Sequence, residues 1–370
     1  MMTESIPPQA MQADSTVWAE VPEPSEAVLR RMLETMILVR AFDERALKLQ
    51  RSGRISFCVT SIGEEAANIG TAAALAPQDW VFPSYRQHGL ALYRGVSLAR
   101  LADQLFGNAA DTVKGRQMPC HYSAHDHRFV SISSVIGTQI IQGVGAAMAA
   151  KIRKDDAVTL TYFGDGATSA NDFHSGMNFA GVYQAPVVFV CINNQYAISL
   201  PVRRQTASPS IACKAQAYGM PGLQVDGNNA IEVYRATSYA MEYARSGKGP
   251  ILLELLTYRV APHSSSDDPS RYRDREESTL WLERDPLRVL EQQLEARGLW
   301  NAEVSAQVWS QARDWVNEAT NQAEAKGEPA WETLFEDVYA QMPEALEREK
   351  QALLARESGW ALHGEGEFPL

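Results

Sequence analysis

Apolar residues recur along this chain at two different spacings. Near the start they repeat every three or four positions, which is the period of an amphipathic helix. These residues are Val28, Leu29, Met32, Leu33, Met36 and Ile37. Ser25 precedes the pattern and is a suitable N-cap, while Gly53 follows it and is suited to end a helix. We therefore predict a long helix between Ser25 and Gly53.

The middle of the chain alternates between short apolar runs and helical patterns. The apolar runs have the length of strands and cover residues 158–163, 187–192 and 251–256. The helical stretches cover residues 139–151, 172–183 and 230–245. This alternation is typical of a parallel sheet covered by helices on both faces. We therefore predict an α/β fold built on a doubly wound parallel sheet.

The two ends of the chain differ from this middle. Residues 1–24 mix prolines with polar residues, which predicts an extended N-terminal arm. From Pro286 onward only helical patterns occur, and the last of them contains Phe335, Val338 and Tyr339. We therefore divide the chain into an arm (1–24), an α/β domain (25–285) and a helical C-terminal region that ends in a tail (286–370).

Composition and charge narrow the class of protein. The chain has 370 residues, of which 45% are hydrophobic and 21% charged, as is typical of a folded globular protein. Its net charge of -11 would repel a phosphate backbone, so we expect no nucleic acid partner. No apolar stretch is long enough to span a membrane, and the first residues lack the pattern of a signal peptide. We therefore expect a cytoplasmic protein without a membrane partner.

Two polar motifs follow predicted strands. Gly164, Asp165 and Gly166 come after the first apolar run, and Asn193 and Asn194 come after the second. Parallel strands place their carboxyl ends at one edge of the sheet, where the ligands of open α/β folds bind. A carboxylate oxygen and an amide oxygen suit Mg²⁺. A lone Gly-Asp-Gly is usually just a turn, but two such motifs at one sheet edge predict a magnesium site.

With Asp165 and Asn194 29 positions apart, the sequence resembles the thiamin-diphosphate enzymes. The resemblance narrows to the α chain of the branched-chain 2-oxo acid dehydrogenases, the decarboxylating component of a multienzyme complex. It extends from about residue 25 to the C-terminus. The segments that carry it, in the same order as in the family, are 53–57, 63–66, 82–86, 115–119, 133–139 and 263–269.

The resemblance implies a set of residues that bind thiamin diphosphate and Mg²⁺. The metal ligands would be Asp165, the side chain of Asn194 and the backbone carbonyl of Tyr196. Tyr85 and Arg86 would contact the diphosphate, and a guanidinium suits this role because it binds phosphate oxygens in pairs. Taken alone, Arg86 fits a surface salt bridge equally well. The turn that carries Asp165 adds Gly164, Gly166 and Ala167 to the cofactor-binding set.

Further residues match positions around the organic part of the cofactor. By this resemblance Ser134 would meet the aminopyrimidine through a polar contact, and Ile136 would be the apolar wedge beneath the cofactor, although Ile136 also fits a plain core position. Ser133, Thr138 and Gln139 resemble a potassium site in the family. Polar residues that open a helix are just as often caps.

The resemblance also implies the residues closest to the reaction. His263 matches a histidine that contacts the diphosphate and the incoming lipoyl group, and a histidine there can exchange a proton near neutral pH. We therefore predict His263 and Tyr85 as catalytic residues. Phe57, Tyr85 and Ile136 would line the acyl pocket, although Phe57 fits the core nearly as well.

The family's chemistry is the oxidative decarboxylation of a 2-oxo acid with transfer of the acyl group to a lipoyl domain. The acid that the cofactor needs beside its pyrimidine comes, in the family, from a separate β chain. This sequence contains no second cofactor-binding fold, so we expect two α and two β chains, with a lipoyl-bearing acyltransferase core as a further partner.

Two alternatives stay open at this point. Pyruvate or acetoin could replace the branched-chain acid as substrate, since the pocket is shared with the β chain. From a different class, the chain could be a non-catalytic module that binds a magnesium nucleotide. The absence of a Gly-x-x-x-x-Gly-Lys-Ser/Thr loop argues against the nucleotide module.

Overall fold

Five parallel strands form the centre of the molecule, in the order β1-β2-β3-β7-β6. The computed structural model describes residues 15–357 of the chain. The strands of this sheet are β1 (Trp80–Phe82), β2 (Thr159–Gly164), β3 (Val187–Asn193), β6 (Gly222–Asp226) and β7 (Ile251–Leu256). The predicted α/β fold with a parallel sheet is confirmed, and each of the three predicted strands agrees with the structure to within one residue at either end.

The two faces of the sheet contribute to two separate hydrophobic cores. Val188 and Val190 of β3 pack into one core, whereas Val187 and Phe189 pack into the other. This division follows from the strand geometry, in which successive side chains point to opposite faces. Because both faces are covered, the strand reads as an uninterrupted apolar run in the sequence rather than as an alternating one.

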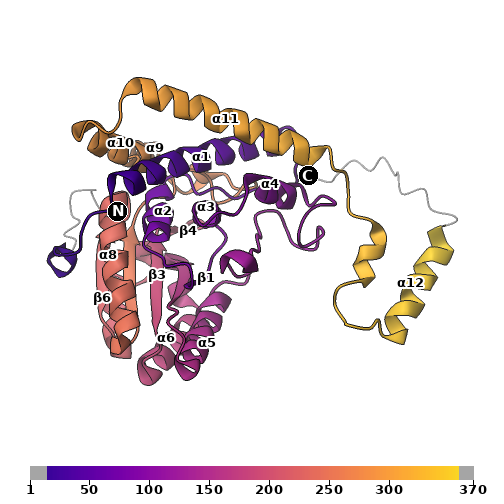
Figure 1. Ribbon diagram of the computed structural model, residues 1–370, viewed down its shortest axis with the longest axis horizontal. Helices are drawn as coiled ribbons and strands as arrows, with labels where there is room; N and C mark the ends of the chain where they lie inside the picture. Colours follow the sequence, from indigo (N-terminus) through magenta and orange to yellow (C-terminus); the bar gives the residue numbers. More distant parts are fainter. Residues whose placement is uncertain (1–14, 358–370) are drawn as a thin grey trace.

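Helices cover both faces (Figure 1). The layer on the side of the larger core contains α1 (Glu26–Arg51), α2 (Glu65–Ala73), α3 (His88–Tyr93), α8 (Ala230–Tyr243) and α10 (Pro286–Ala296). The other face carries α5 (Thr138–Arg153) and α6 (Asn171–Tyr183). The remaining short elements are α7 (Val202–Gln205), α9 (Arg275–Leu282) and the antiparallel pair β4 (Tyr196–Ala197) and β5 (Leu200–Pro201).

The helix α1 begins and ends as its sequence predicts. Its N-cap Ser25 accepts a hydrogen bond from the Val28 backbone N–H at 3.4 Å. Gly53, two positions beyond the last helical residue, has a φ of +71°, a conformation that glycine adopts without strain. The predicted stretches 139–151 and 172–183 correspond to α5 and α6, while the α-helix predicted over 230–245 ends at Tyr243.

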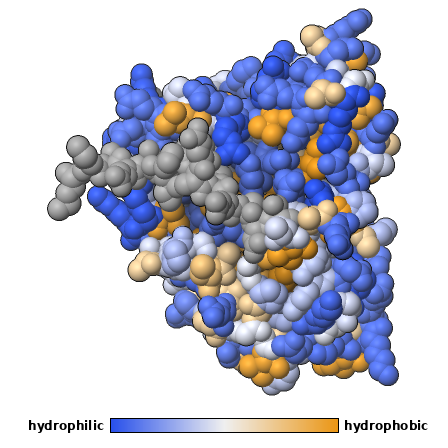
Figure 2. Space-filling model, turned by 90° about the vertical axis from the view of Figure 1, so that its left-hand side faces the viewer, coloured by the Kyte–Doolittle hydropathy of each residue, from blue (hydrophilic) through white to orange (hydrophobic). Residues whose placement is uncertain are grey.

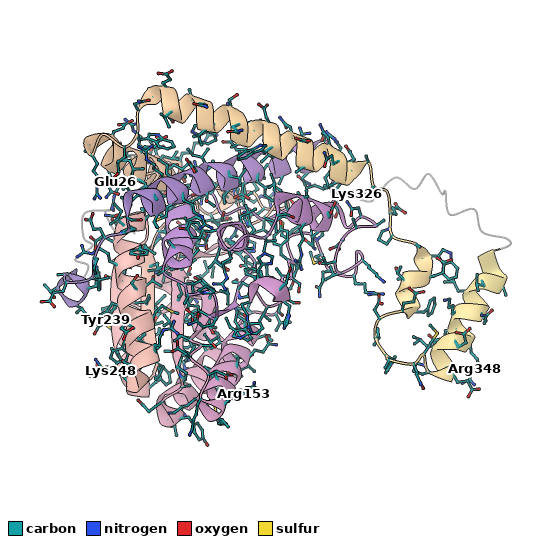
Figure 3. All side chains as sticks on the ribbon, viewed as in Figure 1. Glu26, Arg153, Tyr239, Lys248, Lys326 and Arg348 are labelled. Atoms are coloured by element: carbon teal, nitrogen blue, oxygen red, sulfur yellow. The ribbon has the colours of Figure 1, made fainter. Side chains whose placement is uncertain are left out.

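The C-terminal region is helical as far as Glu324, but it does not remain on the body of the molecule. Helix α11 (Ala302–Glu324) packs against α1 and against α4 (Leu98–Phe106). Beyond Lys326 the chain leaves the body and forms a separate arm that contains α12 (Glu344–Glu357) (Figures 1 and 3). We call residues 328–357 the C-terminal arm.

One predicted helical pattern in this arm is wrong. Phe335 ends a short 3-10 helix that covers Trp331–Phe335, and Val338 and Tyr339 are exposed and lie outside any helix. A helical pattern of apolar residues forms a stable helix mainly when its apolar face packs on another element. In the described part of the chain no element covers these two side chains, so the pattern lacks that support.

The described part of the predicted N-terminal arm is fixed to the body. Trp18 is fully buried, and its indole N–H donates a hydrogen bond to Glu232 of α8 at 2.8 Å. Residues 1–14 of the predicted arm, and residues 358–370 of the predicted tail, lie outside the described residues. The face of the molecule in Figure 2 is mostly hydrophilic, with small groups of hydrophobic residues. Within residues 15–357, no helix has both the length and the apolar character that a membrane span requires.

The two edges of the sheet differ in character. Arg153 and Lys248 precede β2 and β7 in the chain, and Figure 3 shows both at the lower end of the molecule. Asp79, which precedes β1, lies at this amino edge as well and forms an ion pair with Arg245 at 2.9 Å. The amino edge therefore carries ion pairs of Arg245 with Asp79 and Asp156, whereas the predicted motifs lie at the opposite, carboxyl edge.

We predict that Trp18→Ala lowers the free energy of unfolding by about 3–5 kcal/mol, because it empties a fully buried site and leaves Glu232 without its donor. Urea denaturation measures this change. The neighbouring Val17 is 37% exposed, so Val17→Ala should stay within about 0.5 kcal/mol of wild type. Equal effects of the two substitutions would contradict a structural role for this segment.

Candidate active site

A cavity of about 430 Å³ lies at the carboxyl edge of the sheet. Residues from distant parts of the chain line this cavity, and they include most of the predicted site residues. Those residues are Phe57, Tyr85, Arg86, Ser134, Ile136, Gln139, Gly164, Asp165, Gly166, Ala167, Asn194, Tyr196 and His263. Ser133 and Thr138 are not among the lining residues. The cavity therefore unites the two strand-end motifs with the residues matched by resemblance.

Asp165 follows β2 directly and is almost fully buried. Its Oδ2 atom has no hydrogen-bond partner in the described part of the chain. Burial is the main cause that raises the pKa of Asp165 to about 7, and the nearby Glu64 and Glu254 act in the same direction. A buried carboxylate oxygen without a partner is costly, and a bound cation would relieve this cost.

Asn194 supplies the second predicted ligand. Its Nδ2 atom donates a hydrogen bond to Glu64 at 2.6 Å, and its Oδ1 atom accepts one from the Tyr196 backbone N–H at 3.3 Å. Because Oδ1 has two lone pairs, one is left for a metal. The described residues contain no cluster of three or more His, Cys, Asp or Glu side chains that could hold a metal ion. A metal here would therefore rely on one carboxylate and neutral oxygens, as Mg²⁺ sites commonly do.

The backbone around these ligands is close-packed. A Cβ atom at Gly166 would lie 2.8 Å from the Cβ of Ala197, so a larger residue would displace the segment after β3. The carbonyl of Tyr196 accepts a hydrogen bond from Nη1 of Arg259 at 3.2 Å. The predicted role of this carbonyl as a metal ligand thus depends on its second lone pair.

Arg86 is buried, so the alternative of a surface salt bridge is wrong. Its Nη2 atom donates to the backbone carbonyl of His263 at 2.7 Å, and its Nη1 atom donates to the carbonyl of Thr60. Its Nε atom lies 3.7 Å from Oε1 of Glu64. A buried guanidinium held in this way is oriented toward the cavity before any anion binds.

His263 lies beside Arg86 and Tyr85. The ring of Tyr85 contacts the His263 ring edge-on, with 6.0 Å between the ring centroids. The backbone N–H of His263 donates a hydrogen bond to the Asp267 carboxylate at 2.7 Å. Burial, followed by the charges of Arg86 and Arg259, lowers the pKa of His263 to about 4. In these surroundings His263 therefore does not exchange a proton near neutral pH as predicted, because burial and the two arginines disfavour the imidazolium.

The apolar wall of the cavity is partly open. Ile136 is 47% exposed, so the alternative of a plain core position is wrong, while Phe57 both lines the cavity and packs against the larger core. Ser134 shares a hydrogen bond with Nε2 of His121. The Nδ1 atom of His121 lies 3.1 Å from the carbonyl of Pro119, which makes Nδ1 the donor and Nε2 the acceptor.

The three residues matched to a potassium site have separate surroundings. Ser133 accepts a hydrogen bond from the backbone N–H of Val135 at 3.1 Å, and Gln139 donates to the carbonyl of Tyr162 at 2.7 Å. Thr138 is the first residue of α5, whose N-cap is Gly137 without a side-chain cap. The potassium site stays a prediction.

The residues that line or adjoin the cavity but were not among the predicted site residues include Glu64, His121 and Arg259. Glu64 is buried next to Asn194 and Arg86, and burial raises its pKa while Arg86 opposes this rise. In the sequence two consecutive glutamates before an apolar helix look like ordinary N-terminal charges. Arg259 lies three residues beyond β7, at the same edge as the two motifs, and this position is the one signal that points to it.

Comparisons with known proteins show the family of this chain. A family model described as the dehydrogenase E1 component matches residues 33–332. The chain belongs to this family. It is 44% identical over 330 residues to 2-oxoisovalerate dehydrogenase subunit alpha 1, mitochondrial, of Arabidopsis thaliana. The aligned residues cover 89% of the chain and 70% of that relative. It is 42% identical over 331 residues to the mitochondrial alpha subunits of that name from Bos taurus and Homo sapiens, again over 89% of the chain and over 72% and 74% of these relatives.

These findings confirm several of the predictions and correct one. The resemblance to branched-chain 2-oxo acid dehydrogenase α chains and the class of enzyme are confirmed, and membership of the family implies thiamin diphosphate as the cofactor. The expectation of a cytoplasmic protein is wrong, since these relatives are named as mitochondrial proteins. That expectation came from the lack of a signal-peptide pattern.

We predict that His263 titrates with a pKa of about 4 in the folded chain, well below its ordinary value of 6.5. The folded state then binds fewer protons than the unfolded state between pH 6.5 and 4, so this histidine makes the fold less stable as the pH falls through that range. NMR of ¹³C-labelled histidines, with the His263→Asn variant for assignment, measures the value. The same signal should return to about 6.5 in urea, and a folded-state pKa of 6 or above would contradict the effect of the two arginines.

Proposed function

We propose that this chain is the α chain of a branched-chain 2-oxo acid dehydrogenase that carries out oxidative decarboxylation and reductive acylation of a lipoyl domain. The observation that supports it most is the buried Asp165 carboxylate, whose Oδ2 atom has no hydrogen-bond partner in the described part of the chain, in a cavity that also contains Asn194, Arg86 and His263. A buried arginine and such a carboxylate in one cavity suit a ligand that carries both a cation and phosphates.

In this proposal the metal is Mg²⁺ and its protein ligands are Asp165, Oδ1 of Asn194 and the carbonyl of Tyr196. Arg86 and Tyr85 bind the diphosphate, together with the backbone of the turn formed by Gly164, Gly166 and Ala167. When bound, thiamin diphosphate supplies an electron sink for the decarboxylation. The chain's own contribution is to hold the cofactor, to orient it and to exclude water.

Two further lining residues would help to hold the cofactor. Ser134, which shares a hydrogen bond with His121, would meet the aminopyrimidine through a polar contact, and Ile136 would supply an apolar contact. Phe57, Tyr85 and Ile136 form the apolar pocket for the acyl group. We place K⁺ beside the loop that carries Ser134, with Ser133, Thr138 and Gln139 as its ligands.

His263 would act late in the reaction. A bound diphosphate next to it would offset the charges of Arg86 and Arg259, which together with burial lower the pKa of His263. The histidine could then donate a proton to the lipoyl sulfur as the acyl group is transferred. We therefore assign acyl transfer to the lipoyl domain, rather than release of carbon dioxide, as the step that needs His263.

A β chain would complete this site. The cavity wall at Ile136 and Met118 is about half exposed, which suits closure by a second chain. We propose two α and two β chains, with a lipoyl-bearing acyltransferase core as the partner that receives the acyl group.

Reconstitution tests the proposed function. We expect the α chain alone to lack 2-oxo acid decarboxylase activity and to gain it when the β chain is added. The assembled enzyme should prefer 2-oxoisovalerate to pyruvate by tenfold or more in kcat/KM, because each additional buried methylene contributes about 1–3 kcal/mol. Steady-state assays with an artificial electron acceptor measure both. Turnover by the α chain alone would contradict the two-chain proposal, and a preference for pyruvate would contradict the branched-chain substrate.

A second experiment tests the metal ligand. Asp165→Asn keeps the shape of the side chain but removes the charged ligand, so we expect Mg²⁺-dependent binding of thiamin diphosphate to fall by about 100-fold or more. Isothermal titration of the assembled protein measures this binding. Asp155→Asn is the control, because Asp155 is exposed and lies outside the cavity. Cofactor affinity that is equal in the two variants would exclude Asp165 as a ligand.

A further inference from the structure

Glu64 occupies a position that its surroundings specify closely. The preceding Gly63 has a φ of +98°, and a Cβ atom there would lie 2.2 Å from the carbonyl oxygen of Tyr258. The hydroxyl of Thr257 donates to the carbonyl of Gly63 at 2.6 Å. These contacts fix the turn before α2 against the end of β7, and only glycine is compatible with this approach. The turn therefore places Glu64 next to Asn194, which belongs to the motif that follows β3.

The carboxylate of Glu64 is buried and holds the amide of Asn194. Its Oε1 atom accepts the 2.6 Å hydrogen bond from Asn194 Nδ2. An ionised carboxylate is only an acceptor, so the amide must present its nitrogen to Glu64 and its oxygen away from it. Without this partner the two ends of an asparagine amide are nearly equivalent in shape. The short hydrogen bond to Glu64 thus favours the orientation that points Oδ1 away from Glu64, in which Oδ1 also accepts the longer hydrogen bond from the Tyr196 backbone N–H.

We propose that Glu64 is the positioning residue of the metal site, because it fixes the side-chain amide of Asn194 with its oxygen available to Mg²⁺. This inference rests on the proposed function, since that function makes Asn194 a ligand. Residues that orient metal ligands typically contribute about 10-fold to 100-fold in metal affinity. Glu64 contacts no reacting atom in this assignment, and its effect passes through Asn194.

The neighbour Arg86 offers a competing route that the experiment must separate. Its Nε atom lies 3.7 Å from the same Oε1 atom of Glu64, beyond hydrogen-bond distance. Arg86 is also held independently by the carbonyls of Thr60 and His263. Loss of Glu64 therefore leaves Arg86 with two of its partners, whereas the Asn194 amide loses its 2.6 Å hydrogen bond and keeps the 3.3 Å contact with the Tyr196 backbone N–H.

A double-mutant cycle on the assembled α and β chains tests the proposal. The Kd for Mg²⁺ is measured by titrating Mg²⁺ at saturating thiamin diphosphate and following binding of the cofactor by isothermal titration or intrinsic fluorescence. We expect Glu64→Ala to raise this Kd by about 10-fold to 100-fold, with little change in kcat once Mg²⁺ is saturating. Glu64→Gln, which keeps an acceptor oxygen, should cause a smaller rise. In the Asn194→Ala background, Glu64→Ala should raise the Kd no further.

Asp79→Asn is the control for loss of a buried carboxylate. Asp79 is as buried as Glu64 but pairs with Arg245 at the amino edge of the sheet, so this variant should lower the melting temperature without changing the Kd for Mg²⁺. Wild-type Mg²⁺ dependence in Glu64→Ala, or a full additional loss in the Asn194→Ala background, would overturn this inference alone. Failure of the wild-type assembly to bind the cofactor with Mg²⁺ would overturn the proposed function, and this inference with it.

Discussion

The burial of charge at one edge of the sheet is the constraint on which the site depends. Glu64, Arg86, Asp165 and Arg259 are all nearly inaccessible to solvent; Arg86, Asp165 and Arg259 line one cavity, and Glu64 lies behind it against Asn194 and Arg86. Each buried charge is costly unless a partner of opposite sign or several hydrogen bonds offset it. The arginines are offset by backbone carbonyls and by Glu64, but one carboxylate oxygen of Asp165 has no partner among residues 15–357. Burial of the Asp165 carboxylate therefore costs the fold free energy, and a bound cation would reduce this cost.

The parts of the fold that depend on local pattern could be predicted from the sequence. A strand buried on both faces appears as a short apolar run, and the motifs that follow β2 and β3 lie at the same edge because the strands are parallel. The prediction that Tyr85, Ser134 and His263 belong to the site came mainly from the resemblance. In the sequence, only the positions of Tyr85 after β1 and of His263 after β7 relate them to the sheet edge that carries Asp165. The roles of these residues remain proposals.

The rest of the site depends on contacts between distant segments. Glu64 and Asn194 are 130 positions apart, and only the folded chain shows that they share a hydrogen bond. The lowered pKa of His263 likewise depends on Arg86 and Arg259, which come from other segments. The prediction of a helix around Val338 is wrong for the opposite reason. The local pattern is present, but no element of the described chain packs against the side chains of Val338 and Tyr339. Local pattern thus predicts elements, whereas charge environments need the tertiary structure.

The C-terminal arm forms ionic contacts with the body at Lys114 and Arg116, in the loop that continues to the cavity. Asp337 in the arm forms ion pairs with Lys114 and Arg116, and Arg116 also donates to the carbonyl of Glu336 at 3.0 Å. The same loop continues to Met118 and His121, which line the cavity. Ion pairs that are partly exposed weaken as salt concentration rises. Through residues 114–116 the arm therefore contacts a segment that continues into the lining of the cavity, and a rise in ionic strength weakens this contact.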